Sequence, residues 1–175
     1  MKARGGMLDM KVSKLTVDPF TNLPIIILRD EAGTEALPIW IGLIEASAIA
    51  SELEKIALDR PMTHDLMKNI IGECGVKVDR VEVHDVRENT FYATIHLVGR
   101  GQSGKTNKPK RMAIDARPSD AIALALRTGA RICVARKVID EARKLDKRPD
   151  AAHADGDGPG ILEQLDDEDF GKWKM

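Results

Sequence analysis

The sequence predicts an α+β fold in which a mixed β-sheet packs against helices, and three observations lead to this prediction. Segments that alternate apolar and polar residues, typical of half-buried strands, recur along the chain. Two Ala-rich segments with apolar residues at helical spacing directly follow such strands. The 175 residues are 43% hydrophobic but only 3% aromatic, so the chain can bury one core made mostly of aliphatic side chains.

The first third of the chain predicts three strands and a helix. Residues 7–17 alternate as a strand, Asp18-Pro19 marks a turn, and residues 23–29 return as the second strand of a hairpin. A short apolar strand follows at 37–41. Apolar residues at helical spacing then predict a helix over 44–58.

A second helix and two strands are expected in the middle of the chain. Thr63 is a suitable N-cap, and the apolar face of the helix that follows comprises Leu66, Met67, Ile70, Ile71 and Cys74. Residues 76–86 are typical of a strand whose alternation shifts at Asp79-Arg80, which indicates a β-bulge. Residues 91–98 alternate regularly and continue the sheet.

The last third predicts strand, helix, strand and helix in turn. A strand over 110–115 leads into an apolar helix over 118–127, which begins with a proline and ends before Gly129. Residues 131–135 then predict a buried strand, and residues 138–145 a short helix.

Two segments of the chain resemble each other. Segments 38–53 and 111–126 both run strand, turn and Ala-rich helix when they are laid over each other. The similarity suggests that a strand-turn-helix unit is duplicated within the chain.

Composition divides the chain into three parts. We expect residues 1–148 to form one domain, residues 149–160 a flexible linker, and residues 161–175 an acidic tail that includes a docking segment. Residues 150–175 carry 8 acidic and 2 basic side chains, a net charge of −6, whereas residues 1–149 carry 20 and 25, a net charge of +5. A basic body can attract the phosphates of a nucleic acid.

Cysteine usage and hydropathy bear on the cellular compartment. Cys74 and Cys133 each lie in an apolar run, so both are expected to be buried, reduced thiols. No apolar run is long enough to cross a membrane, and the first residues lack the apolar core of a signal peptide. The sequence therefore predicts a cytoplasmic protein.

Residues 99–106, GRGQSGKT, match the phosphate-binding loop pattern G-x-x-x-x-G-K-[ST]. A working loop of this kind needs a helix directly after it, because the helix N-terminus binds the phosphates. Pro109 and the strand expected at 110–115 leave no place for that helix. We therefore expect a β-hairpin loop here and no nucleotide cofactor.

The same loop carries an excess of positive charge. Its cations include Arg100, Lys105 and Lys108. They either protect a hairpin edge from aggregation or contact the phosphates of a nucleic acid. Both interpretations stay open.

The first cluster of polar residues is RPMTHD at 60–65. Thr63 can cap the helix, and Asp65 interacts favourably with the positive helix end. Capping does not require Arg60 or His64, so these two side chains are candidates for a catalytic or substrate-binding role.

The second cluster is DARPSD at 115–120. Ser119 or Asp120 can cap the helix that follows, and Arg117 can pair with either aspartate. Alternatively, the carboxylates of Asp115 and Asp120 can hold a divalent cation beside a phosphate. The capping interpretation needs no further partner.

At these two clusters the sequence resembles the bifunctional nuclease domain family. The similarity extends from roughly residue 8 to 140 and is carried by several independent motifs. These are LPIWIG at 37–42 followed by Glu45, RPMTHDL at 60–66, NTFYATIHL at 89–97 and IDARPSDAIALALRTGARICV at 114–134. The ending EDFGKWKM also resembles the C-terminus of many bacterial members.

The resemblance implies an α+β domain, often a homodimer or higher homo-oligomer, found in bacteria and plants. It also implies nuclease activity on DNA and RNA. The 99–111 loop departs from the family pattern, so a family-wide active site is not expected there.

Two hypotheses follow. In the first, the chain is a metal-assisted phosphodiesterase in which Mg²⁺ or Mn²⁺ binds Asp115, Asp120 and Glu45. The other candidate catalytic residues are His64 for proton transfer, Asp65 as an alternative metal ligand, and Arg117 or Arg60 for stabilising charge. The candidates for substrate binding are Arg60, Ser119, Arg100, Lys105 and Lys108. In the second, the chain is a non-catalytic oligomeric module that binds a protein or nucleic acid.

Overall fold

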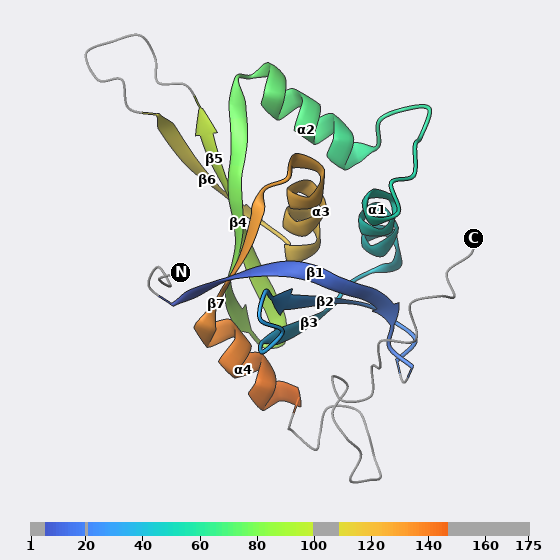
Figure 1. Ribbon diagram of the computed structural model, residues 1–175, viewed down its shortest axis with the longest axis vertical. Coiled ribbons are helices and arrows are strands. Elements are labelled where there is room, and N and C mark those ends of the chain that lie inside the picture. Colours follow the sequence, from blue (N-terminus) through green and yellow to red (C-terminus); the bar gives the residue numbers. More distant parts are fainter. Residues whose placement is uncertain (1–5, 20, 100–108, 147–175) are drawn as a thin grey trace.

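The computed structural model describes residues 6–19, 21–99 and 109–146 (Figure 1). The linker and tail predicted at 149–160 and 161–175 lie outside the described residues. Within them the elements follow the order β1 (Met7–Val17), β2 (Pro24–Asp30), β3 (Ala36–Trp40), α1 (Leu43–Leu53), α2 (Thr63–Glu73), β4 (Val76–Arg87), β5 (Thr90–Gly99), β6 (Lys110–Ala116), α3 (Pro118–Thr128), β7 (Arg131–Ala135) and α4 (Arg136–Asp146).

The described strands form one twisted sheet in the order β3-β2-β1-β7-β4-β5-β6. Neighbouring strands are antiparallel except for β4 and β7, which pair in parallel. The sheet is therefore mixed, and the predicted α+β fold is confirmed. The register of β4 against β5 shifts between Val78 and Arg80, at the predicted bulge.

The sheet has two similar halves. The meander β1-β2-β3 leads into α1, and the meander β4-β5-β6 leads into α3 (Figure 1). The resembling segments are thus β3 with α1 and β6 with α3, and the two strands occupy opposite edges of the sheet. This arrangement agrees with a duplicated strand-turn-helix unit.

Helix α3 occupies the centre of the fold. Its Ala121, Ile122 and Leu124 are fully buried against Val81 and Val83 of β4. In Figure 1, α1, α2 and α3 lie together above β1, whereas α4 lies below it and packs on β4, β7 and β3. Among the described residues, no helix is both long enough and apolar enough to cross a membrane.

The strands on either side of the phosphate-binding loop pattern form a hairpin, as expected. Strands β5 and β6 are antiparallel, and Gly99 pairs with Lys110. A strand therefore takes the position that a nucleotide-binding loop needs for its helix. Arg100, Lys105 and Lys108 lie outside the described residues, so their contacts stay predictions.

Helix α1 ends earlier than the sequence predicted. The chain turns at Lys55, whose φ is +52°, while the N–H of Ile56 donates to the carbonyl of Ser51 at 2.9 Å. A residue in the left-handed conformation often ends a helix in this way, because it lets the following N–H groups bond to the last free carbonyls. Ile56 and Leu58, expected on a helix, lie instead in an exposed loop.

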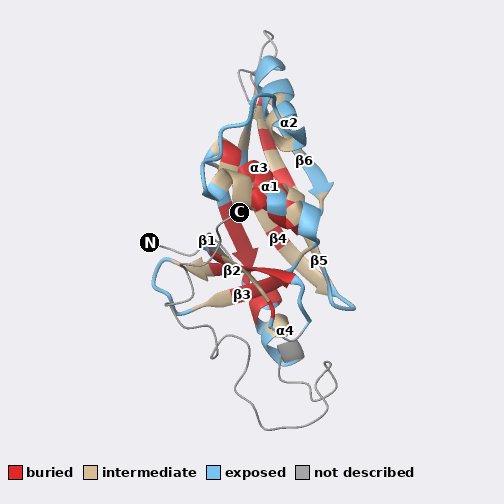
Figure 2. Cartoon of the chain, turned by 90° about the vertical axis from the view of Figure 1, so that its right-hand side faces the viewer, coloured by how far each residue is buried: buried red, intermediate tan, exposed pale blue. Residues whose placement is uncertain are grey.

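Helix α2 differs from its prediction in its cap and in its packing. Met62, not Thr63, is the N-cap, and its N–H donates to the Asp65 carboxylate at 3.0 Å. Of the expected apolar face only Ile71 packs against the core, and Leu66, Met67 and Ile70 are exposed. Figure 2 accordingly shows much of α2 in pale blue. Cys74 is likewise exposed, so the prediction of two buried thiols is right only for Cys133.

Candidate active site

Three helices bring the two polar clusters together. Glu45 near the start of α1 contacts Arg117 at the start of α3, and Ser51 near the end of α1 contacts Arg127 near the end of α3. Helices α1 and α3 therefore run parallel, side by side. The start of α2 lies across them, because His64 contacts Asp120 and Asp65 contacts Arg127.

Arg117 connects two of the candidate carboxylates. Its Nε donates to Asp120 Oδ2 at 2.7 Å, its Nη2 to Asp120 Oδ1 at 3.2 Å, and its Nη1 to Glu45 Oε1 at 2.8 Å. The Arg117 side chain is nevertheless 65% exposed. A guanidinium has more N–H donors than these three bonds use, so Arg117 can still bind an anion.

His64 completes this group, which we call the Arg117 network: Glu45, His64, Arg117 and Asp120. The Nε2 atom of His64 lies 3.3 Å from Asp120 Oδ1, and the imidazole is largely shielded from solvent. Asp120 is not used as a helix cap, since α3 has no side-chain cap. The capping interpretation of DARPSD, by Ser119 or by Asp120, is therefore wrong.

The charges of the network fix the protonation of Asp120. Burial alone would raise the pKa of Asp120, but the hydrogen bond and charge of Arg117, followed by those of His64, hold that pKa below its ordinary value. An ionised carboxylate can only accept, so the proton of a neutral His64 lies on Nε2. The Nδ1 atom is then left with a lone pair that can accept a proton.

Asp65 belongs to a separate, structural ion pair. Arg127 Nε donates to Asp65 Oδ1 at 2.7 Å, and the other Asp65 oxygen accepts the Met62 N–H. Burial raises the pKa of Asp65, but the hydrogen bonds from Arg127 and Met62 outweigh it and lower that pKa. Both carboxylate oxygens are thus engaged by the ion pair and the helix cap, and a catalytic or metal-binding role of Asp65 stays a prediction.

Arg127 was not predicted from the sequence. Its side chain is only 3% exposed, and it also donates to Ser51 Oγ and to the carbonyl of Ala123. One sequence signal could have identified it. Arg127 is the single charged residue between Ala121 and Thr128 of an apolar helix, and it lies seven residues after Asp120.

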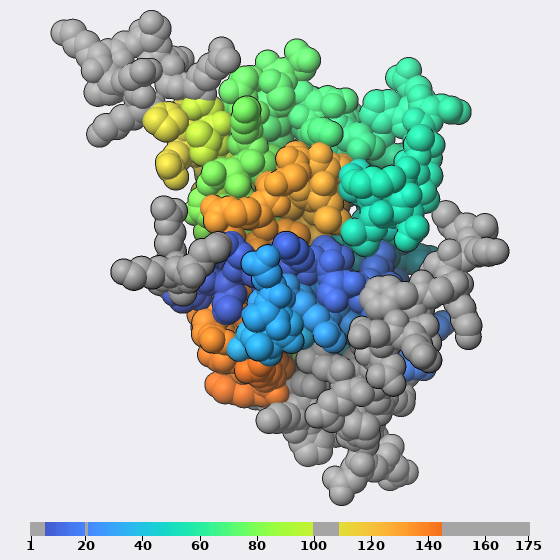
Figure 3. Space-filling model, viewed as in Figure 1, coloured from blue at the N-terminus to red at the C-terminus, as the bar shows by residue number. Residues whose placement is uncertain are grey.

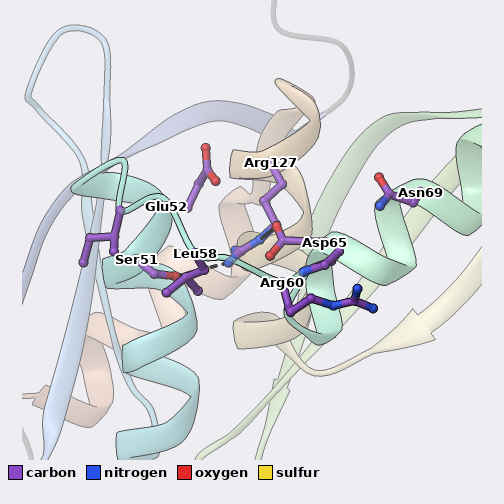
Figure 4. Close-up of a pocket in the computed structure, with 9 residues that line it drawn as sticks. Ser51, Glu52, Leu58, Arg60, Asp65, Asn69 and Arg127 are labelled. Carbon is purple, nitrogen blue, oxygen red and sulfur yellow. Dashed lines mark hydrogen bonds and ion pairs between the residues drawn. The ribbon is translucent and has the colours of Figure 1, made fainter.

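Arg127 and Asp65 form the floor of a hollow of about 320 Å³ beside the network. The hollow is also lined by Ser51, Glu52, Ile56, Leu58, Arg60, Pro61 and Asn69. In the space-filling view, α1 and the loop after it (teal) border α3 (orange) and α2 (green) (Figure 3). Figure 4 shows the Arg127 guanidinium directed at Asp65, while Arg60 extends away from this pair.

The remaining site predictions are not brought into this group. Asp115 pairs with Thr94 in the sheet, while the flanking Ala116 pairs with the core residue Ala93. Because side chains alternate along a strand, Asp115 projects from the sheet face opposite the core helices. Ser119 is buried at the second position of α3.

The predicted metal set therefore does not assemble. Asp115 lies on the other sheet face. The Arg117 guanidinium occupies the space between the Glu45 and Asp120 carboxylates, where a metal ion would have to bind. Within residues 6–19, 21–99 and 109–146, no three His, Cys, Asp or Glu side chains gather as ligands for an ion. These residues do not fit a metal ion in this conformation.

Comparison with known proteins gives a family match. The sequence model of the bifunctional nuclease domain matches residues 26–147, which include every member of the Arg117 network and of the hollow. An uncharacterised protein of Mycobacterium tuberculosis is 36% identical over 134 residues, which cover 77% of this chain and 75% of that protein.

Plant proteins are more distant relatives. Bifunctional nuclease 1 of Oryza sativa subsp. indica is 26% identical over 65% of this chain and 33% of its own length. Bifunctional nuclease 1 of Arabidopsis thaliana is 28% identical over 59% of this chain and 31% of its own length. The similarity to each plant protein thus covers about a third of that protein.

Proposed function

The chain belongs to the bifunctional nuclease domain family, and on that premise we propose that it hydrolyses phosphodiester bonds of DNA and RNA. The plant relatives are named bifunctional nucleases. One observation carries the proposal at the level of chemistry: an exposed guanidinium and an imidazole meet on one carboxylate. This pairing offers an anion-binding group beside a proton acceptor.

In the proposed reaction, Arg117 binds the phosphate. Its remaining N–H groups donate to non-bridging oxygens of the scissile phosphate and stabilise the charge that develops there. Glu45 and Asp120 hold the guanidinium in place through the bonds described above. They act as positioning residues for Arg117.

His64 is proposed as the general base. Asp120 orients the ring through Nε2, so that Nδ1 accepts a proton from the attacking water. The water oxygen forms a bond to phosphorus, and the bond between phosphorus and the sugar oxygen breaks. The sugar oxygen then takes a proton from solvent. His64 then releases its proton and the base is restored.

The reaction as written uses no metal ion, because the three predicted ligands do not converge. Dependence on Mg²⁺ or Mn²⁺ stays a prediction from the sequence, and so does the cytoplasmic location. A chelator distinguishes the two cases directly. Activity that survives EDTA supports the protein groups alone, and activity that needs added Mg²⁺ or Mn²⁺ supports the sequence prediction.

The test of the proposal is a nuclease assay of the purified full chain on labelled DNA and RNA. We expect His64→Ala to lower the cleavage rate by about 10²–10⁴-fold. His96→Ala is the matched control. His96 also pairs with a carboxylate, that of Glu82 at 2.9 Å, but it lies on strand β5 and not in the Arg117 network. Equal rates for wild type and both variants would indicate a contaminating nuclease.

A second candidate function is a non-catalytic interaction module. The observation that favours it is the exposed apolar face of α1, α2 and the loop between them. Its large exposed residues are Leu43, Ile44, Ile56, Leu58, Met62, Leu66, Met67 and Ile70. Monomeric proteins rarely expose so many neighbouring apolar side chains. Absence of cleavage, with or without added metal, would favour this module over the nuclease.

A further inference from the structure

We infer that the hollow beside the Arg117 network binds the base of an unpaired nucleotide, so that the substrate is single-stranded or locally unpaired nucleic acid. The inference rests on the proposed function, because it names the substrate class for the same site. Four features of the hollow lead to it.

The polar groups at the floor of the hollow already have hydrogen-bond partners. Arg127 donates to Asp65 at 2.7 Å, to Ser51 at 3.3 Å and to the carbonyl of Ala123 at 3.1 Å. Since these bonds connect α1, α2 and α3, the floor keeps its shape without a ligand. Ligand pockets are usually formed in advance in this way.

The lining combines apolar and polar side chains. Ile56, Leu58 and Pro61 of the loop are apolar, while Glu52 and Asn69 offer a carboxylate and an amide. Apolar walls suit the faces of a planar heterocycle, and amide and carboxylate groups suit the donors and acceptors at the edge of a base. The volume, about 320 Å³, falls at the small end of the range for ligand pockets.

The charges decide which part of a nucleotide enters. The carboxylates that line the hollow are already neutralised: Asp65 lies 2.7 Å from Arg127, and Glu52 lies 2.5 Å from Lys55. Because these two cations are occupied, the interior suits an uncharged group better than a phosphate. Arg60 at the rim has no hydrogen-bond or ion-pair partner among the residues that the structure describes. The neutral base therefore enters the hollow and the phosphate stays at the rim, where Arg60 can contact it.

The position of the hollow matches a neighbouring nucleotide. Arg127 and Asp120 are two turns apart on α3, a distance of about 10 Å along the helix axis. On α2, the adjacent residues His64 and Asp65 face the network and the hollow respectively. A base seated in the hollow would thus belong to a nucleotide close to the phosphate held by Arg117, and a paired base cannot enter.

The test measures binding of the full chain to three labelled phosphorothioate probes by fluorescence anisotropy. The probes are a single strand, the same strand in a duplex, and the same strand with abasic sites. We expect the single strand to bind at least about tenfold more tightly than either other probe. Equal affinity for the intact and abasic strands would overturn the inference.

Two variants locate the preference. Leu58→Trp fills the hollow, whereas Leu66→Trp places the same side chain on α2 outside it; both leucines are about half exposed, so both variants should fold. Leu58→Trp should lower single-strand affinity about tenfold and abolish the preference over the duplex, and Leu66→Trp should leave the preference intact. Equal effects of both variants would contradict the inference.

Cleavage of unmodified strands, measured in parallel, separates the two claims. A base-dependent preference without cleavage would contradict the proposed hydrolysis and leave the inference standing. Equal cleavage of single strands and duplexes that Leu58→Trp does not affect would contradict the inference and leave the hydrolysis standing. Neither binding nor cleavage would contradict both.

Discussion

At the scale of single residues, Arg117 and Arg127 show how two similar ion pairs serve different purposes. Both arginines lie at ends of α3, and both donate from Nε to an aspartate at 2.7 Å. The Arg117 side chain is 65% exposed, whereas that of Arg127 is 3% exposed. Exposure leaves Arg117 able to bind a substrate, and burial makes Arg127 a structural residue.

The pair of the buried Arg127 with the partly exposed Asp65 predicts a measurable loss of stability when the carboxylate is removed. Asp65→Ala leaves the Arg127 charge without its carboxylate and should lower the free energy of unfolding by about 2–4 kcal/mol. Asp79→Ala is the matched control, because Asp79 is similarly exposed and also lies 2.7 Å from an arginine, but Arg80 keeps Glu82 as a partner. Urea denaturation should give a loss under about 1 kcal/mol for the control. Equal losses would refute a structural role for Asp65.

Asp115 distinguishes the Arg117 network from the metal site predicted from the sequence. Because Asp115 lies on the opposite sheet face, Asp115→Ala should leave the cleavage rate within about twofold of wild type. Asp120→Asn should lower it by about 10²-fold or more, since it weakens the hold on both His64 and Arg117. A loss for Asp115→Ala as large as that for Asp120→Asn would restore the metal site.

At the scale of elements, an ion pair with Asp85 of β4 is one of the contacts that join α4 to the sheet. Lys137 Nζ lies 2.9 Å from Asp85, and Arg87 contacts the other carboxylate oxygen. The hydrogen bond from Lys137, followed by that from Arg87, lowers the Asp85 pKa to about 2. The unfolded chain therefore binds this proton more readily than the folded protein does.

This shift predicts a pH dependence of stability. The contribution of Asp85 should be complete above the ordinary aspartate pKa, near about 4, and should be lost as pH falls toward about 2. Asp85→Asn and Lys137→Ala should each flatten the rise of unfolding free energy between these values in urea titrations. An unchanged slope in both variants would contradict the pairing.

Most elements could be predicted because their signals are local. Alternation identified the strands, and the failed context of GRGQSGKT identified the β5–β6 hairpin, since Pro109 would interrupt a helix that begins directly after the pattern. The end of α1 could not be predicted, because Lys55 closes it at positive φ without a glycine. The open face of α2 could not be predicted either, because periodicity shows which side is apolar but not what covers it.

The site was predictable only in part. His64 stood out because helix capping did not require it, Arg117 and Asp120 because their cluster could also serve a phosphate site, and Glu45 through the family resemblance. Their convergence depends on how α1, α2 and α3 pack, which no local pattern contains. Arg127 was missed because its structural role depends on an ion pair with Asp65, which lies 62 residues away in the sequence.

At the scale of the whole molecule, exposed apolar side chains of α2 outside the hollow, among them Met67 and Ile70, are suited to a covering partner, and we propose that a second copy of the chain covers them. Ile70→Asp should then convert a dimer to a monomer by light scattering. Leu23→Asp, at a leucine of similar exposure in the β1–β2 turn, should leave the dimer intact. A monomeric wild type at all concentrations would contradict this proposal.

The central claim is that the Arg117 network cleaves phosphodiester bonds, and one comparison of single-turnover rates tests it most directly. Arg117→Ala should lower the cleavage rate of a labelled strand by about 10²–10³-fold. Arg87→Ala should keep the wild-type rate, although Arg87 is equally exposed and also pairs with an aspartate. Equal rates for the two variants, or no cleavage by the wild type, would contradict the claim.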